Sequence, residues 1–281
     1  MKFIRYIPDS LRHTIIGLCF SLLLPFPAWS VTLEGDLTQG GMVIGRVTPG
    51  DEVTVNKQAI RVSHDGVFLL GFGRDDKLDH DLAVSRDGKT IEQKRVSISK
   101  REYRIQQVNG LPPSKVTPPK RDWDRIKRET ALVKKARRLD DDRHDFLTGF
   151  IWPAKGIISG VYGSQRVLNG VPKRPHFGVD VAAPVGTKVV APADGIVTLA
   201  HPDMFYSGGT LIVDHGHQLS SSFLHLHKIL VKEGERVKQG EPIAEIGATG
   251  RVTGAHLDWR MNLRNARIDP QFLVPPMPDT E

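Results

Sequence analysis

Cysteine is almost absent from this sequence: the 281 residues include one, Cys19. A single cysteine cannot form a disulfide within the chain, so the fold must be stabilised by core packing. Cys19 lies inside an apolar run near the N-terminus and lacks the small-residue context expected for lipid attachment. If that run is removed, the remaining chain has no thiol, which excludes thiol chemistry.

Long apolar runs are also missing. The run from Thr14 to Leu24 is well short of the ~20 residues that a membrane-spanning helix needs. Basic residues precede this run, and "AWS" with small residues at 28 and 30 follows it. This order predicts a cleavable secretory signal peptide over residues 1–30, hence an exported protein; an uncleaved membrane anchor is the alternative.

Acidic residues are outnumbered, and the formal net charge is +7. Removing residues 1–30 takes away three basic residues and Asp9, leaving +5. A moderate positive charge suits an acidic polymer such as a cell wall, or an anionic membrane surface, and is equally typical of a soluble protein without such a partner. Nucleic acid is not an expected partner, because the protein is predicted to be exported and has no recognisable nucleic-acid-binding motif.

Residues 31–108 have the pattern of a small antiparallel β-sandwich. Short alternating pairs of apolar residues are separated by the turn sequences "PGD", "HDG" and "RDG". His64 and His80 lie beside aspartates in turn-like contexts, and we expect both to be solvated loop residues. The alternating pairs are Val53/Val55, Ile60/Val62, Val67/Leu69, Leu82/Val84 and Val96/Ile98.

Residues 109–149 are expected to connect two domains. "NGLPPSKVTPPK" breaks regular structure and marks a Pro-rich linker at 109–120. The charged segment 121–138 then repeats apolar residues at helical spacing, which predicts a surface helix packing one stripe on a neighbouring domain. That stripe consists of Trp123, Ile126, Thr130 and Val133.

Residues 150–275 are Gly-rich and β-branched with tight turns, which predicts a compact antiparallel β domain followed by a tail at 276–281. The predicted fold class is therefore mainly β. Strands are expected at Ile157–Tyr162, Phe177–Val181, Lys188–Val190, Gly195–Ala200, Thr210–His215, Ser221–Leu226, Pro242–Gly247 and His256–Asn262.

The stretch "RPHFGVDVAAP" carries the first candidate site residues. His176, Gly178 and Asp180 are two residues apart, so a regular strand places all three on one face. Histidine and aspartate are zinc ligands, and a glycine between them leaves room for an ion and a substrate to approach the backbone. Alone this spacing is a weak signal, because His and Asp four residues apart are common.

Two further stretches add histidines and a second aspartate. In "GAHLDWRMN" the strand period places His256 and Asp258 on one face and their neighbours in a core. In "SSSFLHLHKIL" His225 and His227 share a face, and one of them could transfer protons beside a metal, although incidental histidines on a half-exposed strand would look the same. Two other histidines, in "VDHGHQL", are expected to make structural hydrogen bonds: His215 and His217.

Together the three stretches resemble the lysostaphin-type zinc metallopeptidases, which cut the peptide part of peptidoglycan. The resemblance covers most of the C-terminal domain. The H-x-G-x-D of that family implies His176 and Asp180 as zinc ligands, and its Y-x-H-L implies His225 as a catalytic histidine. Its terminal H-x-H implies His256 as catalytic and places Asp258 where the family has a third zinc-binding histidine.

The aspartate at position 258 changes the expected site. A carboxylate binds zinc at about the same distance as an imidazole, so the substitution need not empty the site. His176, Asp180 and Asp258 would together carry −2 and cancel the charge of the ion, which makes zinc a poorer Lewis acid. An oxygen-richer ligand set also favours harder metals, so manganese is the alternative to zinc.

These residues predict an exported zinc-dependent endopeptidase, with one zinc per chain, that hydrolyses peptide cross-links of peptidoglycan. The alternative is a catalytically inactive wall-binding regulator or activator of other hydrolases on the same scaffold. The enzyme is favoured because the other motif positions are kept and the replacement is itself a metal-binding group. Arg166 and Arg174 flank the predicted cleft and could hold a substrate carboxylate; the equally weighted alternative is that both are solvated surface residues. A plain signal peptide without wall-anchoring repeats suggests a periplasmic location.

Overall fold

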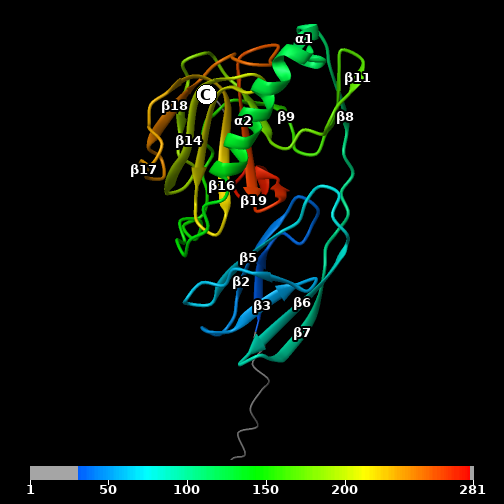
Figure 1. Cartoon of the computed structure of the whole chain (residues 1–281), viewed down its shortest axis with the longest axis vertical. Coiled ribbons are helices and arrows are strands. Elements are labelled where there is room, and N and C mark those ends of the chain that lie inside the picture. Colours follow the sequence, from blue (N-terminus) through cyan, green and yellow to red (C-terminus); the bar gives the residue numbers. More distant parts are fainter. Residues whose placement is uncertain (1–30, 279–281) are drawn as a thin grey trace, which may run out of the picture.

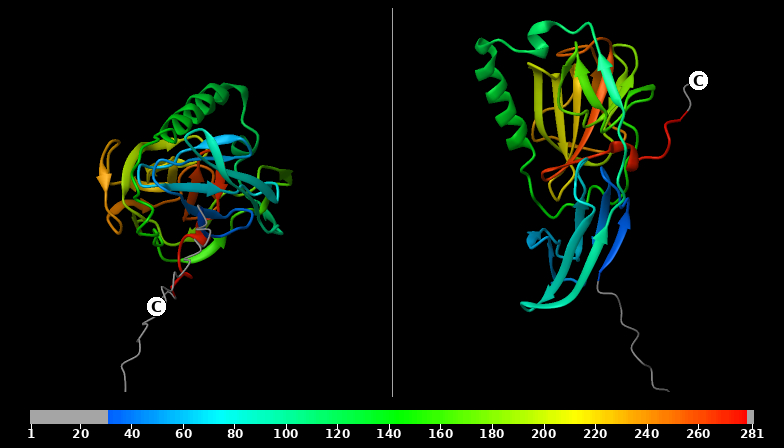
Figure 2. Two further views of the ribbon diagram at one scale, coloured as in Figure 1. Left: turned by 90° about the horizontal axis from the view of Figure 1, so that it is seen from below. Right: turned by 90° about the vertical axis from the view of Figure 1, so that its right-hand side faces the viewer.

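The structure, a computed structural model, describes residues 31–278; the predicted signal peptide, Cys19 and the last residues of the tail lie outside the described residues. Figure 1 shows an N-terminal and a C-terminal domain stacked along the long axis, and the right-hand view of Figure 2 shows helix α2 on the flank of the C-terminal domain. The predicted mainly β fold is confirmed. Within residues 31–278 no helix is long and apolar enough to cross a membrane.

Two small sheets enclose the core of the N-terminal domain. Alternate residues of their strands bury one shared apolar cluster, which includes Phe68, Leu82 and Val84. The first sheet has the order β1-β2-β5 and the second β4-β3-β6-β7. Their bounds are Thr32–Gly35 for β1, Met42–Arg46 for β2, Glu52–Val55 for β3, Gln58–Ile60 for β4, Val67–Gly71 for β5, Asp79–Arg86 for β6 and Lys89–Ser97 for β7.

One expectation for this domain was wrong. His64 is exposed, but His80 lies in strand β6 and is buried. The side-chain amide of Asn56 donates to its Nδ1 at 3.2 Å, and its Nε2 donates to the carbonyl of Lys77 at 3.0 Å. His80 is therefore a hydrogen-bonded core residue, in which both ring nitrogens have partners.

The connecting segment runs along the C-terminal domain. Strand β8 (Ile105–Val108) pairs in parallel with β10 (Gln165–Leu168) of that domain. Helix α1 (Pro113–Val116) and the 3₁₀ turn Lys120–Asp122 then lead into α2 (Trp123–Ala136). Val133 and Ala136 of α2 pack against an apolar patch of the sheet formed by Leu199, Met204 and Ile212. The predicted helix is thus present, but Trp123, expected in its packed stripe, is 57% exposed.

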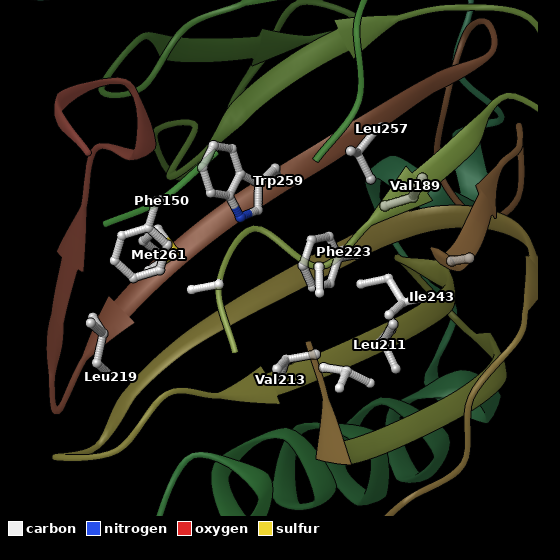
Figure 3. Packing of buried hydrophobic residues seen from close by; sticks show 14 of the residues in the cluster. Phe150, Val189, Leu211, Val213, Leu219, Phe223, Ile243, Leu257, Trp259 and Met261 are labelled. Atoms are coloured by element: carbon white, nitrogen blue, oxygen red, sulfur yellow. The ribbon is translucent and has the colours of Figure 1, made fainter. Parts of the chain in front are cut away.

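A ten-stranded antiparallel sheet forms most of the C-terminal domain. Its main path runs β17-β14-β15-β16-β19-β12-β9, and β13, β18 and β20 pair alongside. Figure 3 shows the buried side chains between these strands, with Phe223 and Trp259 among the largest. Two more strands of this domain, β10 and β11, lie outside that sheet and form a three-stranded sheet of order β11-β10-β8. The bounds of all these strands are Ile157–Gly160 for β9, Gln165–Leu168 for β10, Val171–Pro172 for β11, Val179–Ala182 for β12, Lys188–Val190 for β13, Gly195–Met204 for β14, Gly208–Asp214 for β15, Leu219–Ile229 for β16, Arg236–Val237 for β17, Pro242–Ile246 for β18, His256–Leu263 for β19 and Ala266–Ile268 for β20; a 3₁₀ turn spans Pro270–Phe272.

The N-terminal domain packs at one end of β19. Gly71 of β5 lies close to β19 and its neighbour β20. A Cβ at Gly71 would come within 2.8 Å of Ile268 in β20 and 3.0 Å of Leu263 in β19. Arg101 also forms an ion pair of 2.9 Å with the buried Asp269. Since β19 begins at His256, the N-terminal domain lies at the opposite end of the strand from the predicted site.

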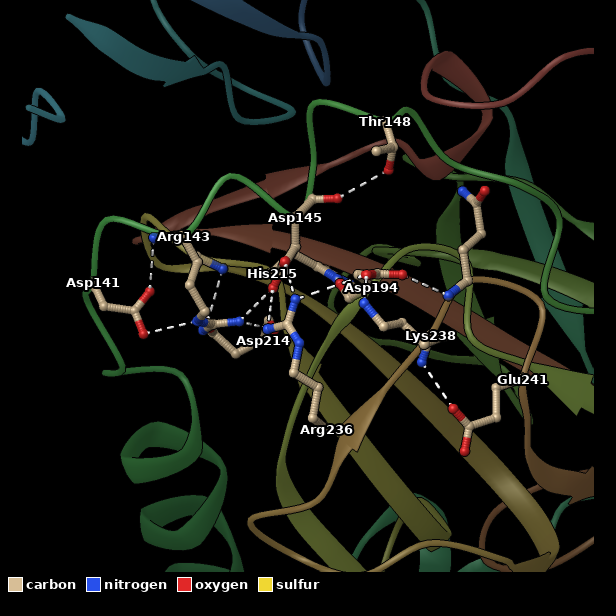
Figure 4. A network of polar contacts seen from close by, with 12 residues as sticks. Asp141, Arg143, Asp145, Thr148, Asp194, Asp214, His215, Arg236, Lys238 and Glu241 are labelled. Atoms are coloured by element: carbon tan, nitrogen blue, oxygen red, sulfur yellow. Dashed lines mark hydrogen bonds and ion pairs between the residues drawn. The ribbon is translucent and has the colours of Figure 1, made fainter. Parts of the chain in front are cut away.

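Segment 139–149 is held to the C-terminal domain by a polar network, shown in Figure 4. Arg143 donates to Asp141, Asp145 and Asp214 at 2.9, 2.6 and 2.5 Å. Asp145 also accepts from Arg236 at 2.5 Å. These charge-assisted bonds hold the segment that follows helix α2 against the sheet.

His215, which lies near this network, should make the stability of the fold sensitive to acid. It is fully buried; its Nδ1 donates to the Asp194 carbonyl at 2.7 Å, and the Ser221 hydroxyl donates to its Nε2 at 2.8 Å. Burial lowers the pKa of His215 to about 4 from 6.5. The pKa of His215 is lower in the folded than in the unfolded chain, so acid protonates the unfolded chain first. The free energy of unfolding is therefore highest above pH 6.5 and falls as the pH drops towards 4.

We therefore expect the unfolding free energy of metal-free protein to fall by about 3 kcal/mol from this residue alone between pH 7.5 and pH 4. Urea unfolding at the two pH values measures the difference. His215→Gln should flatten the dependence, whereas the exposed His227→Gln should leave it unchanged. An equal slope in wild type and His215→Gln contradicts the assignment.

Candidate metal centre

Strand register brings two candidate ligands face to face. Antiparallel pairing of β12 with β19 places Asp180 directly opposite Asp258. On the other side of β19, strand β16 places Leu224 opposite Asp258, so His225 follows at the same level of the sheet. Residues distant in sequence thus meet because β19 lies between β16 and β12.

His176 reaches the centre from outside the regular sheet. Strand β12 begins at Val179, later than predicted, so His176 and Asp180 are not on one continuous strand. The His176 backbone amide donates to the Ser164 carbonyl at 2.8 Å, and its carbonyl accepts from Gly163 at 2.7 Å. These two bonds hold the imidazole beside the carboxylates.

The three predicted ligands fit a metal ion. His176, Asp180 and Asp258 are buried, and each offers an atom such that all three atoms lie within 4.8 Å of one another. His176 Nε2 and Asp180 Oδ1 lie 3.0 Å apart, yet both are buried without a hydrogen-bond partner in the described part of the chain. Buried polar atoms are normally paired, and a cation between these atoms would satisfy both.

Two arginines compensate the carboxylates, a feature the sequence analysis did not identify. Arg260 binds both oxygens of Asp258, with Nε–Oδ1 and Nη2–Oδ2 distances of 2.9 and 2.5 Å. Arg166 donates to Asp180 Oδ2 at 2.5 Å. Burial opposes ionisation, but the charge of Arg260 holds the pKa of Asp258 below its ordinary value. The four side chains together are neutral, so the −2 expected from the ligands alone is offset.

Glycine at position 178 makes this arrangement possible. A Cβ there would lie 2.6 Å from Arg260 Cγ, 2.6 Å from Asp258 Oδ1 and 2.5 Å from the Trp259 carbonyl oxygen. Any side chain would therefore displace the ion pair between Arg260 and Asp258. The room expected for an ion and a substrate is used here by an arginine.

The two predicted catalytic histidines lie together beside the ligands. The ring centroids of His225 and His256 are 4.9 Å apart, and His256 Nε2 lies 3.8 Å from Asp180 Oδ1. Nδ1 of His225 donates to the Thr249 carbonyl at 2.8 Å, and Nδ1 of His256 to the Gly254 carbonyl at 2.9 Å. In each neutral ring Nε2 is therefore free to accept a proton.

His225 occupies a strained position. Its φ is +68°, in the left-handed region, where the pairing of β16 with its neighbours shifts register. This irregularity turns the side chain towards the site, while Phe223 remains in the core and His227 is exposed. His215 and His217 were both expected to make structural hydrogen bonds. His215 does, but the ring nitrogens of His217 have no hydrogen-bond partner within residues 31–278, so the expectation for His217 was wrong.

A cleft of about 450 Å³ opens beside these residues. Helix α2 contributes to its wall through Thr130, Val133 and Arg137. The predicted substrate-binding residues Arg166 and Arg174 both line it, although Arg166 is engaged with a ligand carboxylate. Its lining residues come from position 130 onward, so the helix borders the cleft and the N-terminal sandwich does not.

Part of the chain is similar in sequence to known proteins. Residues 174–270 match the sequence model of peptidase family M23. The Vibrio cholerae serotype O1 proteins ShyB and ShyA, described as peptidoglycan DD-endopeptidases, are 45% and 40% identical over 97 and 120 residues. The alignments cover 34% and 41% of this chain but 22% and 27% of those relatives, so the chain spans less than a third of their length.

A solved structure extends the likeness to the fold. A crystal structure of a Pseudomonas aeruginosa protein assigned to peptidase M23 superposes with a TM-score of 0.64 at 29% identity. The match covers 85% of this chain and 95% of that one. Because 85% exceeds the C-terminal domain, the shared architecture includes residues of the N-terminal part.

Proposed function

We propose that this chain, whose residues 174–270 match peptidase family M23, is an exported metalloendopeptidase that hydrolyses peptide cross-links of peptidoglycan. The described relatives ShyB and ShyA point to D,D cross-links as the bond. The predicted export and the envelope location of such a substrate support action in the periplasm.

The observation that carries this proposal is the convergence of three buried ligand atoms with two histidines. His176, Asp180 and Asp258 would hold one zinc ion, with manganese as the alternative for this oxygen-rich set. Bound zinc would supply Lewis-acid polarisation of the scissile carbonyl. His225 and His256 border the same point without being needed as ligands.

The two histidines are suited to move protons. Their Nδ1 atoms are committed to backbone carbonyls, so Nε2 of each ring is left for proton transfer. His225 lines the cleft, and His256 Nε2 lies 3.8 Å from Asp180 Oδ1. One Nε2 can take a proton from the attacking water, and the resulting N–H can then donate to the developing oxyanion or to the leaving amine. Burial lowers the pKa of His225 to about 4, which keeps this ring neutral at neutral pH.

The first test is metal content together with cleavage. Purified 31–281 should contain about one metal per chain and cleave cross-linked muropeptides, and a chelator or His176→Ala should abolish both. His225→Ala should lower kcat by roughly 10²–10⁴-fold while metal content stays unchanged. Protein that neither retains metal nor cleaves muropeptides with added zinc or manganese, at neutral or alkaline pH, contradicts the proposal.

One observation favours the non-enzymatic alternative. Arg260 and Arg166 already neutralise the two carboxylates, so the centre could persist as an ion-pair network in a wall-binding regulator. That function predicts sacculus binding that a chelator does not change and in-vivo complementation by His225→Ala. Complementation with this variant separates the two classes, because the endopeptidase needs His225 and the regulator does not.

A further inference from the structure

The cleft beside the metal centre is strongly cationic. Seven of its lining residues are Arg or Lys and none is Asp or Glu. Arg166 and Arg260 are paired with ligand carboxylates. The other five form no ion pair within the described residues 31–278: Arg137, Lys173, Arg174, Arg251 and Arg267.

Two of these arginines, Arg137 and Arg267, bind residues that lie next to Arg260 in the sheet. Ser222 on β16 is the cross-strand partner of Arg260, and Arg137 donates to the Ser222 hydroxyl at 2.9 Å. Asn262, two residues beyond Arg260 on the same face of β19, accepts from Arg267 of β20 at 2.6 Å. Three guanidinium groups thus follow one face of the sheet away from the metal ligands.

This row of charges has one carboxylate for three arginines. Burial and the neighbouring arginines lower the pKa of Arg137 and bring the pKa of Arg267 to about 10. Arg137 Nε is buried and has no hydrogen-bond partner in the described chain. Both arginines are half-buried, and their printed side-chain partners, Ser222 and Asn262, are neutral, so an anion from outside the chain would suit them.

We propose that Arg137 and Arg267 form a subsite for a carboxylate of the peptide substrate. Planar guanidinium groups suit carboxylates, and both arginines line the cleft, whose lining also includes the exposed Arg174. Counted along β19 from Asp258, the subsite lies roughly 7–13 Å from the metal ligands. That span is roughly two to four residues of an extended peptide, so a carboxylate near the scissile bond fits it. The peptide's identity rests on the proposed function; the anion subsite does not.

The position of Arg137 makes helix α2 part of the binding site. Arg137 immediately follows the last helical residue, Ala136, which packs on the sheet. The helix therefore carries one half of the subsite, and the sheet, through Arg267, carries the other. A helix that merely covered the cleft would need no charged residue at this point.

The test uses the full chain and an uncross-linked stem peptide, which offers no cross-link to hydrolyse. Calorimetry compares this peptide, with its side-chain carboxylates free, with the same peptide carrying carboxamides instead. We expect the carboxylate form to bind roughly tenfold to a hundredfold more tightly. Arg137→Gln and Arg267→Gln should each remove most of this preference, while Arg128→Gln, an exposed arginine of the same helix outside the cleft, should keep it.

Further arms make each outcome informative. Arg137→Lys and Arg267→Lys retain the charge and should keep part of the preference if the glutamine variants fail to fold. Equal binding of both peptides, or competition by inorganic phosphate at the concentration of the peptide, overturns the assignment to a peptide carboxylate. If the protein prefers the carboxylate peptide but cannot cleave muropeptides, the subsite is supported and the endopeptidase proposal is contradicted. If the protein cleaves muropeptides but binds both peptides equally, the endopeptidase proposal is supported and the subsite is contradicted.

Discussion

Asp258→Ala is expected to reduce the metal content from about one per chain to near zero and to destabilise the fold even without metal. The substitution removes one of three converging ligands. It also leaves Arg260 beside the core without its carboxylate partner. Breaking a buried ion pair from one side costs about 3–5 kcal/mol, and the low end is expected here because the Arg260 side chain is 26% exposed and can reach water.

Two measurements separate these effects. Metal analysis after dialysis reports the ligand role of Asp258, and urea unfolding in the presence of a chelator reports the ion pair. Glu233→Ala, on an exposed loop of the same domain, is the control and should change neither. Asp258→Ala protein that retains as much metal as the wild type contradicts the ligand assignment, whatever its stability.

The sequence predicted three candidate ligands that the structure brings together, but not the arginines that neutralise the two carboxylates. His176, Asp180 and Asp258 could be found because a resemblance to a known motif identifies residue types at fixed spacing, and the structure brings them together. Arg260 carried a signal that was not used: it continues the same strand face as His256 and Asp258. The charge argument from the sequence therefore counted the carboxylates and omitted their partners.

Other features had no signal in the sequence. Arg137 meets Ser222 across 85 positions of the chain, and only the packing of α2 on the sheet creates that contact. His80 looked like a turn residue beside an aspartate, yet the pairing of β6 with β3 and β7 buries it. Local patterns predicted the elements well because alternation and turns are local, whereas pairing partners of charged side chains depend on sheet order.

Asp258→His is expected to weaken metal binding, although histidine is the residue usual at this position in the family that the sequence resembles. The substitution keeps a ligand but removes the counter-charge of Arg260, which then faces the ion as an uncompensated cation. Two unit charges about 5 Å apart interact by about 3 kcal/mol at the effective dielectric constant of protein sites, and a divalent ion doubles this. Even after partial relaxation of the Arg260 side chain, we expect at least a roughly tenfold loss of affinity.

The double variant Asp258→His/Arg260→Gln removes both charges and should bind metal at least roughly tenfold more tightly than Asp258→His alone. Competition with a chromophoric chelator measures the affinities, and the shift of the melting temperature on adding zinc provides a second readout that does not depend on activity. The non-additivity of the two substitutions is the signature of the pair, because Arg260→Gln alone leaves Asp258 without its bidentate partner. Asp258→His protein that binds zinc as tightly as the wild type would mean that Arg260 swings clear of the ion, and residues 258 and 260 would then not act as one charge-balanced unit.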